Sequence, residues 1–220
     1  MGRGRTGVGW VHRAQLLLVN SRGARWDALW QRLGATPPDG AYADLVQQYS
    51  TPGRHYHTLS HLDAVLASFD QLRHLAPNPD LAELALWLHD VVWEPMRDDC
   101  EQRSVEWAAS RLPALQAFPA LAALILETRH FAVPSVDPDA AVVRDADLSI
   151  LAADEPVFDA YERAVRAEYA MLPAAQFNAG RSRILAEFAG RRPLYFTAPG
   201  QSWEARARAN LARSLARLGP

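Results

Sequence analysis

The sequence predicts an all-α fold, and three observations lead to that prediction. Apolar residues recur at helical spacing almost throughout the 220-residue chain, sustained alternation with a period of two is missing, and breaks containing proline or glycine separate most of the helical segments. Only two short β-branched runs occur, Val91-Val92-Trp93 and Ala141-Val142-Val143, and both lie within or beside helical patterns. A hydrophobic content of 49% is enough for one domain with a sizeable core.

The helical segments follow one another along the chain. Trp26, Leu29, Trp30 and Leu33 fall at positions i, i+3, i+4 and i+7, which is the stripe of an amphipathic helix. Similar patterns predict helices over Ala41–Tyr49, Ser60–Leu75, Leu81–Trp93, Glu101–Leu112, Ala120–Phe131, Asp139–Ala152, Glu155–Met171, Ala174–Ala189 and Ser202–Leu218. Residues 1–21 are rich in glycine and arginine and show little periodicity, so we expect a flexible lead-in before a single domain over residues 22–220.

Composition excludes several classes of function. The 23 basic and 25 acidic side chains give a net charge of −2, so the overall field favours neither a nucleic acid nor an acidic membrane surface. All the basic residues are arginines, which removes lysine-based Schiff-base chemistry and the lysine of phosphate-binding loops. The single cysteine, Cys100, excludes an intrachain disulfide and a cysteine-rich zinc site. No stretch approaches the roughly 20 apolar residues of a membrane span; we expect a cytoplasmic protein, and homo-oligomerisation is left open.

Three histidines are concentrated in eight residues, Arg54-His55-Tyr56-His57-Thr58-Leu59-Ser60-His61, where a helix is expected to begin. Four residues separate His57 from His61, so their imidazoles face the same side if both lie on the first turn of that helix. Two isolated histidines would more often be structural. Further candidate ligands elsewhere in the chain favour a functional interpretation.

The apolar run Leu84–Leu88 ends in an adjacent imidazole and carboxylate, His89 and Asp90. Burying such a pair without a partner is costly, and a first-row divalent cation satisfies both groups. A third position lies within Arg144–Leu151, where Asp147 sits in an otherwise apolar stretch. Asp145, two residues earlier, is the alternative candidate, either as the ligand or as an outer carboxylate.

This order, one histidine, then His-Asp, then a distant Asp before Leu, resembles the HD superfamily of metal-dependent phosphohydrolases. The resemblance spans His61 to Asp147, and the segments Asp98–Ser104 and Tyr161–Tyr169 look like those of a bacterial subfamily of predicted HD phosphohydrolases. It implies a single-domain HD-type helical bundle and a metal site formed by His61, His89, Asp90 and Asp147. The identity of the divalent ion, Mn, Mg, Co, Ni, Fe or Zn, stays open.

The segment Tyr56–Val65 is also similar to the Tyr-His-Asn-x-x-His-Ala-x-x-Val motif of cyclic-nucleotide phosphodiesterases, which are distant HD relatives. The resemblance implies that His61 is a metal ligand and that His57 is the general acid, which protonates the leaving oxygen. Thr58 replaces the Asn of that motif and Leu62 its Ala, and no purine-binding glutamine is identified. We therefore expect the roles of His57 and His61 to apply here, but not the cyclic-nucleotide substrate.

Several further residues are candidates for the reaction. Glu101 follows the Asp98-Asp99 pair and could assist the attacking water, although a carboxylate at a helix N-terminus is favoured anyway. Arg54 and Arg129 could bind phosphate, with Arg129 suited to a bidentate contact. His130 could contact the substrate phosphate or a second metal. Each of these residues could equally have a structural role.

The resemblance and the residues together predict hydrolysis of a phosphate ester of a nucleotide or small metabolite, with Asp90 among the catalytic groups and a metal that activates the attacking water. A di-iron oxygenase on the same scaffold is one alternative, but it needs extra histidine ligands that only His130 and His57 could supply. A non-catalytic HD module that senses a nucleotide is the other. The expected partner is a small phosphorylated molecule.

Overall fold

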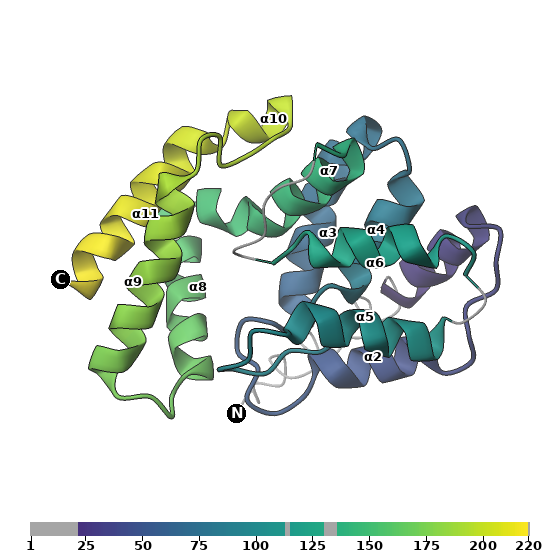
Figure 1. Ribbon diagram of the computed structural model, residues 1–220, viewed down its shortest axis with the longest axis horizontal. Coiled ribbons are helices and arrows are strands. Elements are labelled where there is room, and N and C mark those ends of the chain that lie inside the picture. The colour runs from purple at the N-terminus through teal and green to yellow at the C-terminus, as the bar shows by residue number, and fades with distance from the viewer. Residues whose placement is uncertain (1–21, 113–114, 130–135, 220) are drawn as a thin grey trace, which may run out of the picture.

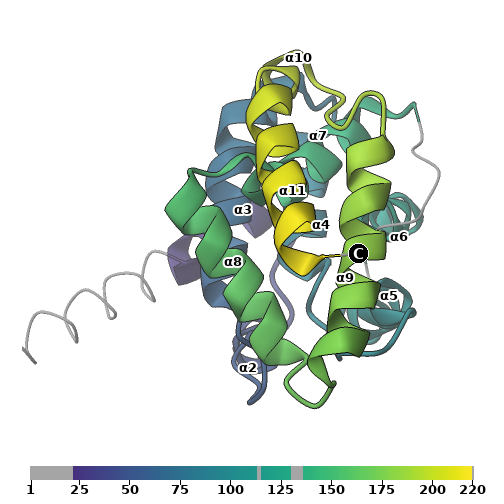
Figure 2. The same cartoon turned by 90° about the vertical axis from the view of Figure 1, so that its left-hand side faces the viewer.

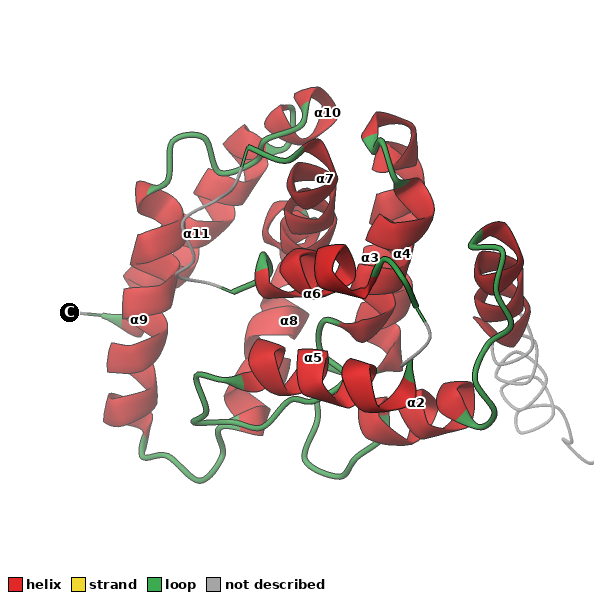
Figure 3. Ribbon diagram, turned by 45° about the vertical axis from the view of Figure 1, so that its right-hand side comes forward, coloured by secondary structure: helices red, strands yellow, loops and turns green. Residues whose placement is uncertain are grey.

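The regular structure of this chain is helical in every part that the structure describes. A computed structural model describes residues 22–112, 115–129 and 136–219, and within these ranges it contains helices, turns and loops but no strand (Figure 3). The all-α prediction is thereby confirmed for the described residues. The expected lead-in over residues 1–21 and the candidate His130 lie outside them.

After a helix over residues 22–32, the elements are α2 (Ala41–Tyr49), α3 (Leu59–Leu72), η1 (Arg73–Leu75), α4 (Pro79–Leu88), α5 (Cys100–Arg111), α6 (Phe118–Leu126), α7 (Pro138–Asp147), η2 (Leu148–Ala152), α8 (Glu155–Glu168), α9 (Ala174–Gly190), α10 (Ala198–Gln201) and α11 (Glu204–Leu218).

The first apolar core surrounds α4. Every residue from Leu81 to Leu88 is buried, and α4 packs against α3, α5, α6 and α7 (Figure 1). Trp87 on α4 packs edge-to-face on Trp26 from the helix over residues 22–32. A helix that is apolar on all sides has to lie inside the protein, so α4 forms a fixed centre for the elements around it.

Glu83 is the one charged residue buried in the middle of α4, with 1% of its surface exposed. Its carboxylate accepts hydrogen bonds from Arg25 and Arg32 of the helix over residues 22–32 and from Arg73 of η1. A buried carboxylate with so many charge-assisted partners is satisfied, whereas one without them would be costly. This anchor fixes the first described helix and η1 against α4.

The second apolar core is formed by η2, α8, α9 and α11. Phe158 on α8, Leu185 on α9 and Leu211 on α11 are fully buried in it, together with Tyr195 from the loop before α10. Figure 1 shows α8, α9 and α11 beside the α3 to α7 group, and Figure 2 shows the same three helices face-on in front of α3 and α4. The segment from α7 to η2 connects the two groups.

Several helices end earlier than the sequence pattern suggested, and contacts from distant residues explain two of these ends. The helix predicted over Leu81–Trp93 stops at Leu88, because Arg54 binds the carbonyls of Asp90 and Val91 and the chain turns there. The helix predicted over Asp139–Ala152 changes at Leu148 into the 3₁₀ segment η2, whose carbonyls accept hydrogen bonds from Tyr195 and Asn210. The short helix α10 was not predicted. No helix in the described ranges is both long and apolar enough to span a bilayer.

Candidate metal centre

Four side chains from three helices meet at one point between the two cores. His61 is the third residue of α3, His89 and Asp90 directly follow α4, and Asp147 is the last residue of α7. The two histidine Nε2 atoms are 3.2 Å apart, Asp90 Oδ2 lies 3.0 Å from His89 Nε2 and 3.3 Å from His61 Nε2, and Asp147 Oδ1 lies 3.3 and 3.6 Å from the same two atoms.

These separations suit a shared divalent ion. A cation bound to nitrogen and oxygen donors at about 2.0–2.2 Å places neighbouring donor atoms roughly 3.0–3.4 Å apart. Candidate ligand atoms of His61, His89 and Asp90 all lie within 4.8 Å of one another, and Asp147 approaches both imidazoles. Among the described residues, this is the one such group of three or more potential ligands.

The orientation of His89 is set by the helix that carries it. Its Nδ1 lies 2.8 Å from the carbonyl of Leu86, one turn back in α4, and this contact assigns the Nδ1 proton to the neutral ring. The Nε2 lone pair is then directed at the cluster, which is the arrangement found where histidine binds a metal. His89 is 1% exposed and His61 6%, so water does not solvate the two rings appreciably.

Both aspartates lie at the C-terminal ends of helices, where the helix dipole disfavours an anion. Burial alone would raise the pKa of Asp90, but His89, His57 and the hydrogen bonds from His61 and His89 hold it well below its usual range. Burial likewise opposes ionisation of Asp147, and His89 outweighs it and lowers that pKa. Two ionised carboxylates at two helix C-termini concentrate negative charge, which a positively charged group at this site would balance.

The pKa values of the two histidines are shifted in opposite directions. Burial lowers the pKa of His61. Burial also acts to lower the pKa of His89, but the carboxylates of Asp90 and Asp147 outweigh it and hold this pKa well above its usual range. A proton on His89 therefore balances part of the negative charge, at the position where a divalent cation would balance all of it.

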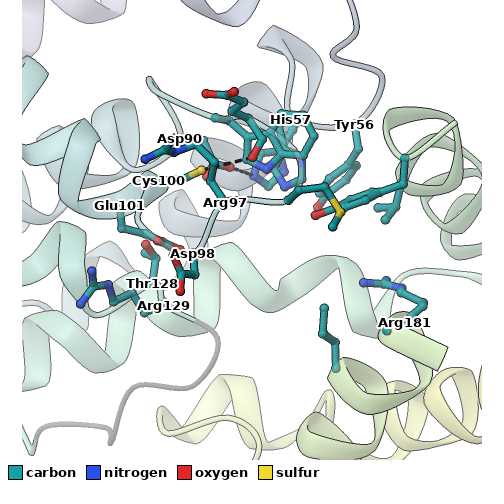
Figure 4. Close-up of a pocket in the computed structure, with 18 of the residues that line it drawn as sticks. Tyr56, His57, Asp90, Arg97, Asp98, Cys100, Glu101, Thr128, Arg129 and Arg181 are labelled. Carbon is teal, nitrogen blue, oxygen red and sulfur yellow. Dashed lines mark hydrogen bonds and ion pairs between the residues drawn. The ribbon is translucent and has the colours of Figure 1, made fainter. Parts of the chain in front are cut away.

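The four donors form the base of a cavity of about 920 Å³ between the two cores. Loop residues 93–99 and the start of α5 form one wall, and α8 and α9 form the opposite wall. Figure 4 shows Asp98, Glu101, Thr128 and Arg129 gathered on one side of the pocket and Arg181 on the other. A volume of this size accommodates a small-molecule substrate.

Glu101 and Arg129, predicted as a catalytic and a substrate-binding residue, lie on the same side of the cavity (Figure 4). Burial raises the pKa of Glu101, and Asp90 adds to the increase. Arg129 lies close enough for its charge to act on Glu101, and its Nε is buried without a hydrogen-bond partner. The structure thus places a carboxyl group with a raised pKa and an arginine with an unused donor on the same side of the cavity.

His57 lies in the loop before α3, not on the first helical turn as its spacing from His61 suggested. Its ring stacks on Trp93 at 4.3 Å, and its Nδ1 lies 2.8 Å from Oε2 of Glu168, a residue that the sequence did not single out. The other oxygen of Glu168 accepts hydrogen bonds from the backbone N–H groups of His55, Tyr56 and His57. Glu168 thereby fixes both the ring and its loop.

No local signal could have identified Glu168, because it is 111 residues away from His57 along the chain. Burial alone would raise the pKa of Glu168, but the His57 side chain and the backbone donors of His57 and Tyr56 outweigh burial and lower it. Glu168 is therefore a buried carboxylate held ionised by the loop that it orients.

Asp145, the alternative distal ligand, faces away from the cluster. Its carboxylate accepts hydrogen bonds from the backbone of Phe196 and from the backbone and hydroxyl of Thr197, at 2.7–3.1 Å. It holds the loop before α10. Of the two aspartates that the sequence left open, the structure brings only Asp147 to the two histidines.

Arg54, predicted to contact the substrate, is placed differently. Its Nη atoms donate to the backbone carbonyls of His57, Asp90 and Val91, and its side chain is not part of the cavity wall. The predicted phosphate contact is therefore not supported, because these donors are engaged in the protein interior. Arg54 instead connects the loop of His57 to the turn of Asp90.

Comparisons with known proteins add no family to these observations. No protein-family model, no curated protein and no solved structure matches the chain.

Proposed function

We propose that the protein is a metal-dependent phosphohydrolase with a single-domain HD-type helical bundle, acting on a phosphate ester of a nucleotide or another small metabolite. One observation carries the proposal: two imidazoles and two carboxylates converge at the base of a large cavity, beside a third histidine that is oriented by a buried carboxylate. The sequence resemblance to HD phosphohydrolases supports the same reaction.

His61, His89, Asp90 and Asp147 would hold the metal. Their neutral imidazole nitrogens and carboxylate oxygens suit Mn²⁺, Fe²⁺, Co²⁺, Ni²⁺ or Zn²⁺, and less readily an all-oxygen ion such as Mg²⁺. When bound, a divalent cation at this position acidifies water and neutralises phosphoryl oxygens, which are the two obstacles to hydrolysing a phosphate ester.

His57 is suited to protonating the leaving alkoxide. With its Nδ1 proton donated to Glu168, a protonated ring has Nε2–H as its transferable proton. Glu168 stabilises the imidazolium and fixes its orientation, and Trp93 restricts the ring from one face. The buried oxygens of Glu168 are fully engaged with the His57 loop, so Glu168 acts through His57 and not on the substrate.

Arg129 and Glu101 complete the proposed mechanism. Arg129 lines the cavity, and its guanidinium suits a phosphoryl oxygen. Because its pKa is raised, the Glu101 carboxylate is more basic and is better suited to accept a proton from the attacking water. In the overall reaction, water adds to phosphorus, the ester P–O bond breaks, and His57 protonates the alcohol that leaves.

The test is phosphate release by metal-reconstituted protein from nucleotides, sugar phosphates and 4-nitrophenyl phosphate, with Asp90→Ala as the blank. We expect His57→Ala to lower the rate about 10²–10⁴-fold on alkyl esters, and less on 4-nitrophenyl phosphate, whose leaving group needs no proton. His55→Ala is the matched control, because the His55 side chain is exposed next to the same loop.

Full activity of both Asp90→Ala and His89→Ala would contradict the proposal. Retained metal binding without turnover on any ester would favour a sensor module, and two irons per chain would favour the oxygenase. The oxygenase needs extra histidine ligands. Within the described residues, His57 is the only further histidine beside the cluster, and its Nδ1 is engaged by Glu168.

A further inference from the structure

We infer that the alcohol released by this site is apolar and carries an aromatic ring, so that the substrate is the phosphate ester of an aryl-substituted alcohol and not of a sugar. This inference rests on the proposed function and concerns the wall formed by α8 and α9. Two features of that wall point to it, its apolar lining and its small number of available polar groups, together with a row of aromatic rings that leads from His57 and Trp93 to this wall.

Residues of η2, of α9 and of the loop before α9 form the apolar lining. Ile150, Leu172 and Ile184 line the cavity and are partly exposed, and the buried Leu151 and Phe188 also line it. An apolar group placed against these side chains displaces water from both surfaces, which favours binding. A specificity gain of about 10- to 200-fold for each methylene-sized contact is typical of such a pocket.

The polar groups of the same wall are engaged by other residues. Arg181 donates to Glu162 and to the hydroxyl of Tyr161. Gln176 and Arg183 also line the cavity, and both are exposed. Sugar hydroxyls bound against the described part of this wall would lose hydrogen bonds to water and find few replacements, which costs affinity.

The aromatic rings indicate where the organic group of the substrate lies relative to His57. Trp93 stacks on His57 with ring centroids 4.3 Å apart, Tyr169 meets Trp93 edge-on at 6.3 Å, and Phe177 of α9 lies 5.9 Å from Tyr169. All four side chains line the cavity. A leaving oxygen protonated by His57 therefore has its organic group next to this row, where a planar ring gains offset or edge-to-face contacts.

The reaction balances without another reactant. The aryl-substituted phosphate ester and water give inorganic phosphate and the alcohol, with the P–O bond to the alcohol broken and a P–O bond to water formed. His57 supplies the proton to the alcohol oxygen, and solvent restores it.

The experiment compares kcat/KM of the metal-loaded protein for 2-naphthylmethyl phosphate, glucose 6-phosphate and adenosine 5′-monophosphate. All three release a primary alkyl alcohol, so differences report recognition of the organic group and not leaving-group acidity. We expect 2-naphthylmethyl phosphate to exceed each of the others by at least about tenfold, and ethyl phosphate to be a poor substrate because it leaves the wall empty.

Ile184→Asn and Leu172→Asn place a polar amide in the wall at two separate positions. Each should lower the ratio of kcat/KM for 2-naphthylmethyl phosphate to kcat/KM for ethyl phosphate about tenfold, while Ile184→Val is the conservative control and should keep this ratio. Circular dichroism shows which variant is folded, and either one suffices. Higher kcat/KM for glucose 6-phosphate or the nucleotide, or no effect of a folded variant, overturns the inference and leaves the phosphohydrolase intact. Metal-loaded protein that hydrolyses none of the esters overturns both.

Discussion

The carboxylates of the candidate metal centre lie at positions that are electrostatically unfavourable for an anion. Asp90 and Asp147 each follow or end a helix, where a carboxylate meets the negative end of the helix dipole, and both are held ionised beside buried imidazoles. Such an arrangement raises the energy of the metal-free protein, and the proposed cation would lower it. Perturbed titration of several groups within one cavity is typical of functional sites.

Glu168 provides a pH-dependent contribution to stability. Its folded-state pKa lies below the ordinary value of 4.5, so its contribution is present above about pH 4.5 and is lost as the pH falls through the lowered pKa. We expect Glu168→Gln to lower the free energy of unfolding at pH 7 by roughly 1.5–3 kcal/mol, because the charge-assisted hydrogen bonds of a buried carboxylate are weakened.

Urea unfolding of the Glu168→Gln variant and the wild type from pH 7 down to pH 3 checks this expectation. The two unfolding free energies should converge as the pH falls. Glu155→Gln on the same helix is the control, since Glu155 is exposed and its ion pair with Arg213 should contribute little. A constant difference at all pH values would show that the Glu168 charge is not what stabilises the loop.

At the scale of elements, the end of α7 depends on a close contact with the α10 segment. Asp145 accepts hydrogen bonds from the loop before α10, and Gly200 in α10 approaches the same carboxylate so closely that a Cβ there would overlap Asp145 Oδ2. Asp147 lies two residues further on, so this contact helps to fix the direction of the last metal-ligand candidate.

Gly200→Ala should therefore lower the free energy of unfolding by about 1–3 kcal/mol, because either α10 or the Asp145 carboxylate has to move. Thermal or urea denaturation measures it. Gly190→Ala, at the end of α9, is the control, since a Cβ there meets nothing within 4 Å and the change should stay within about 1 kcal/mol of zero. Equal stability of both variants would mean that α10 is not held against α7.

The periodicity of the sequence predicted most of these elements, because helix propensity and apolar spacing are local properties. Ala41–Tyr49 was predicted with the same bounds as α2, and the other long helices differ from prediction mainly at their ends. The ends of α4 and α7 were missed because Arg54, Tyr195 and Asn210 decide them from distant parts of the chain.

At the scale of the whole molecule, the candidate site lies where the two apolar cores meet. His61, His89 and Asp90 belong to helices of the first core, Asp147 ends the helix that leads into the second, and α8 and α9 of the second core close the cavity. The sequence indicated His61 through the histidine cluster and His89 and Asp90 at the end of an apolar run, and it left Asp147 and Asp145 as alternatives; the set of four was implied by the resemblance to HD proteins. The sequence could not identify Glu168, the apolar wall or the engagement of Arg54, because each depends on contacts between the separate helix groups.

The central claim is that His61, His89, Asp90 and Asp147 together bind one divalent cation. Isothermal titration of metal-free protein with Mn²⁺, checked by metal analysis of the product, tests it most directly. We expect one ion per chain, binding at least about tenfold weaker in Asp147→Asn, unchanged binding in Asp98→Asn, and a higher melting temperature with metal. A wild-type protein that binds no ion, or an Asp147→Asn variant that binds Mn²⁺ as tightly as the wild type, would contradict it.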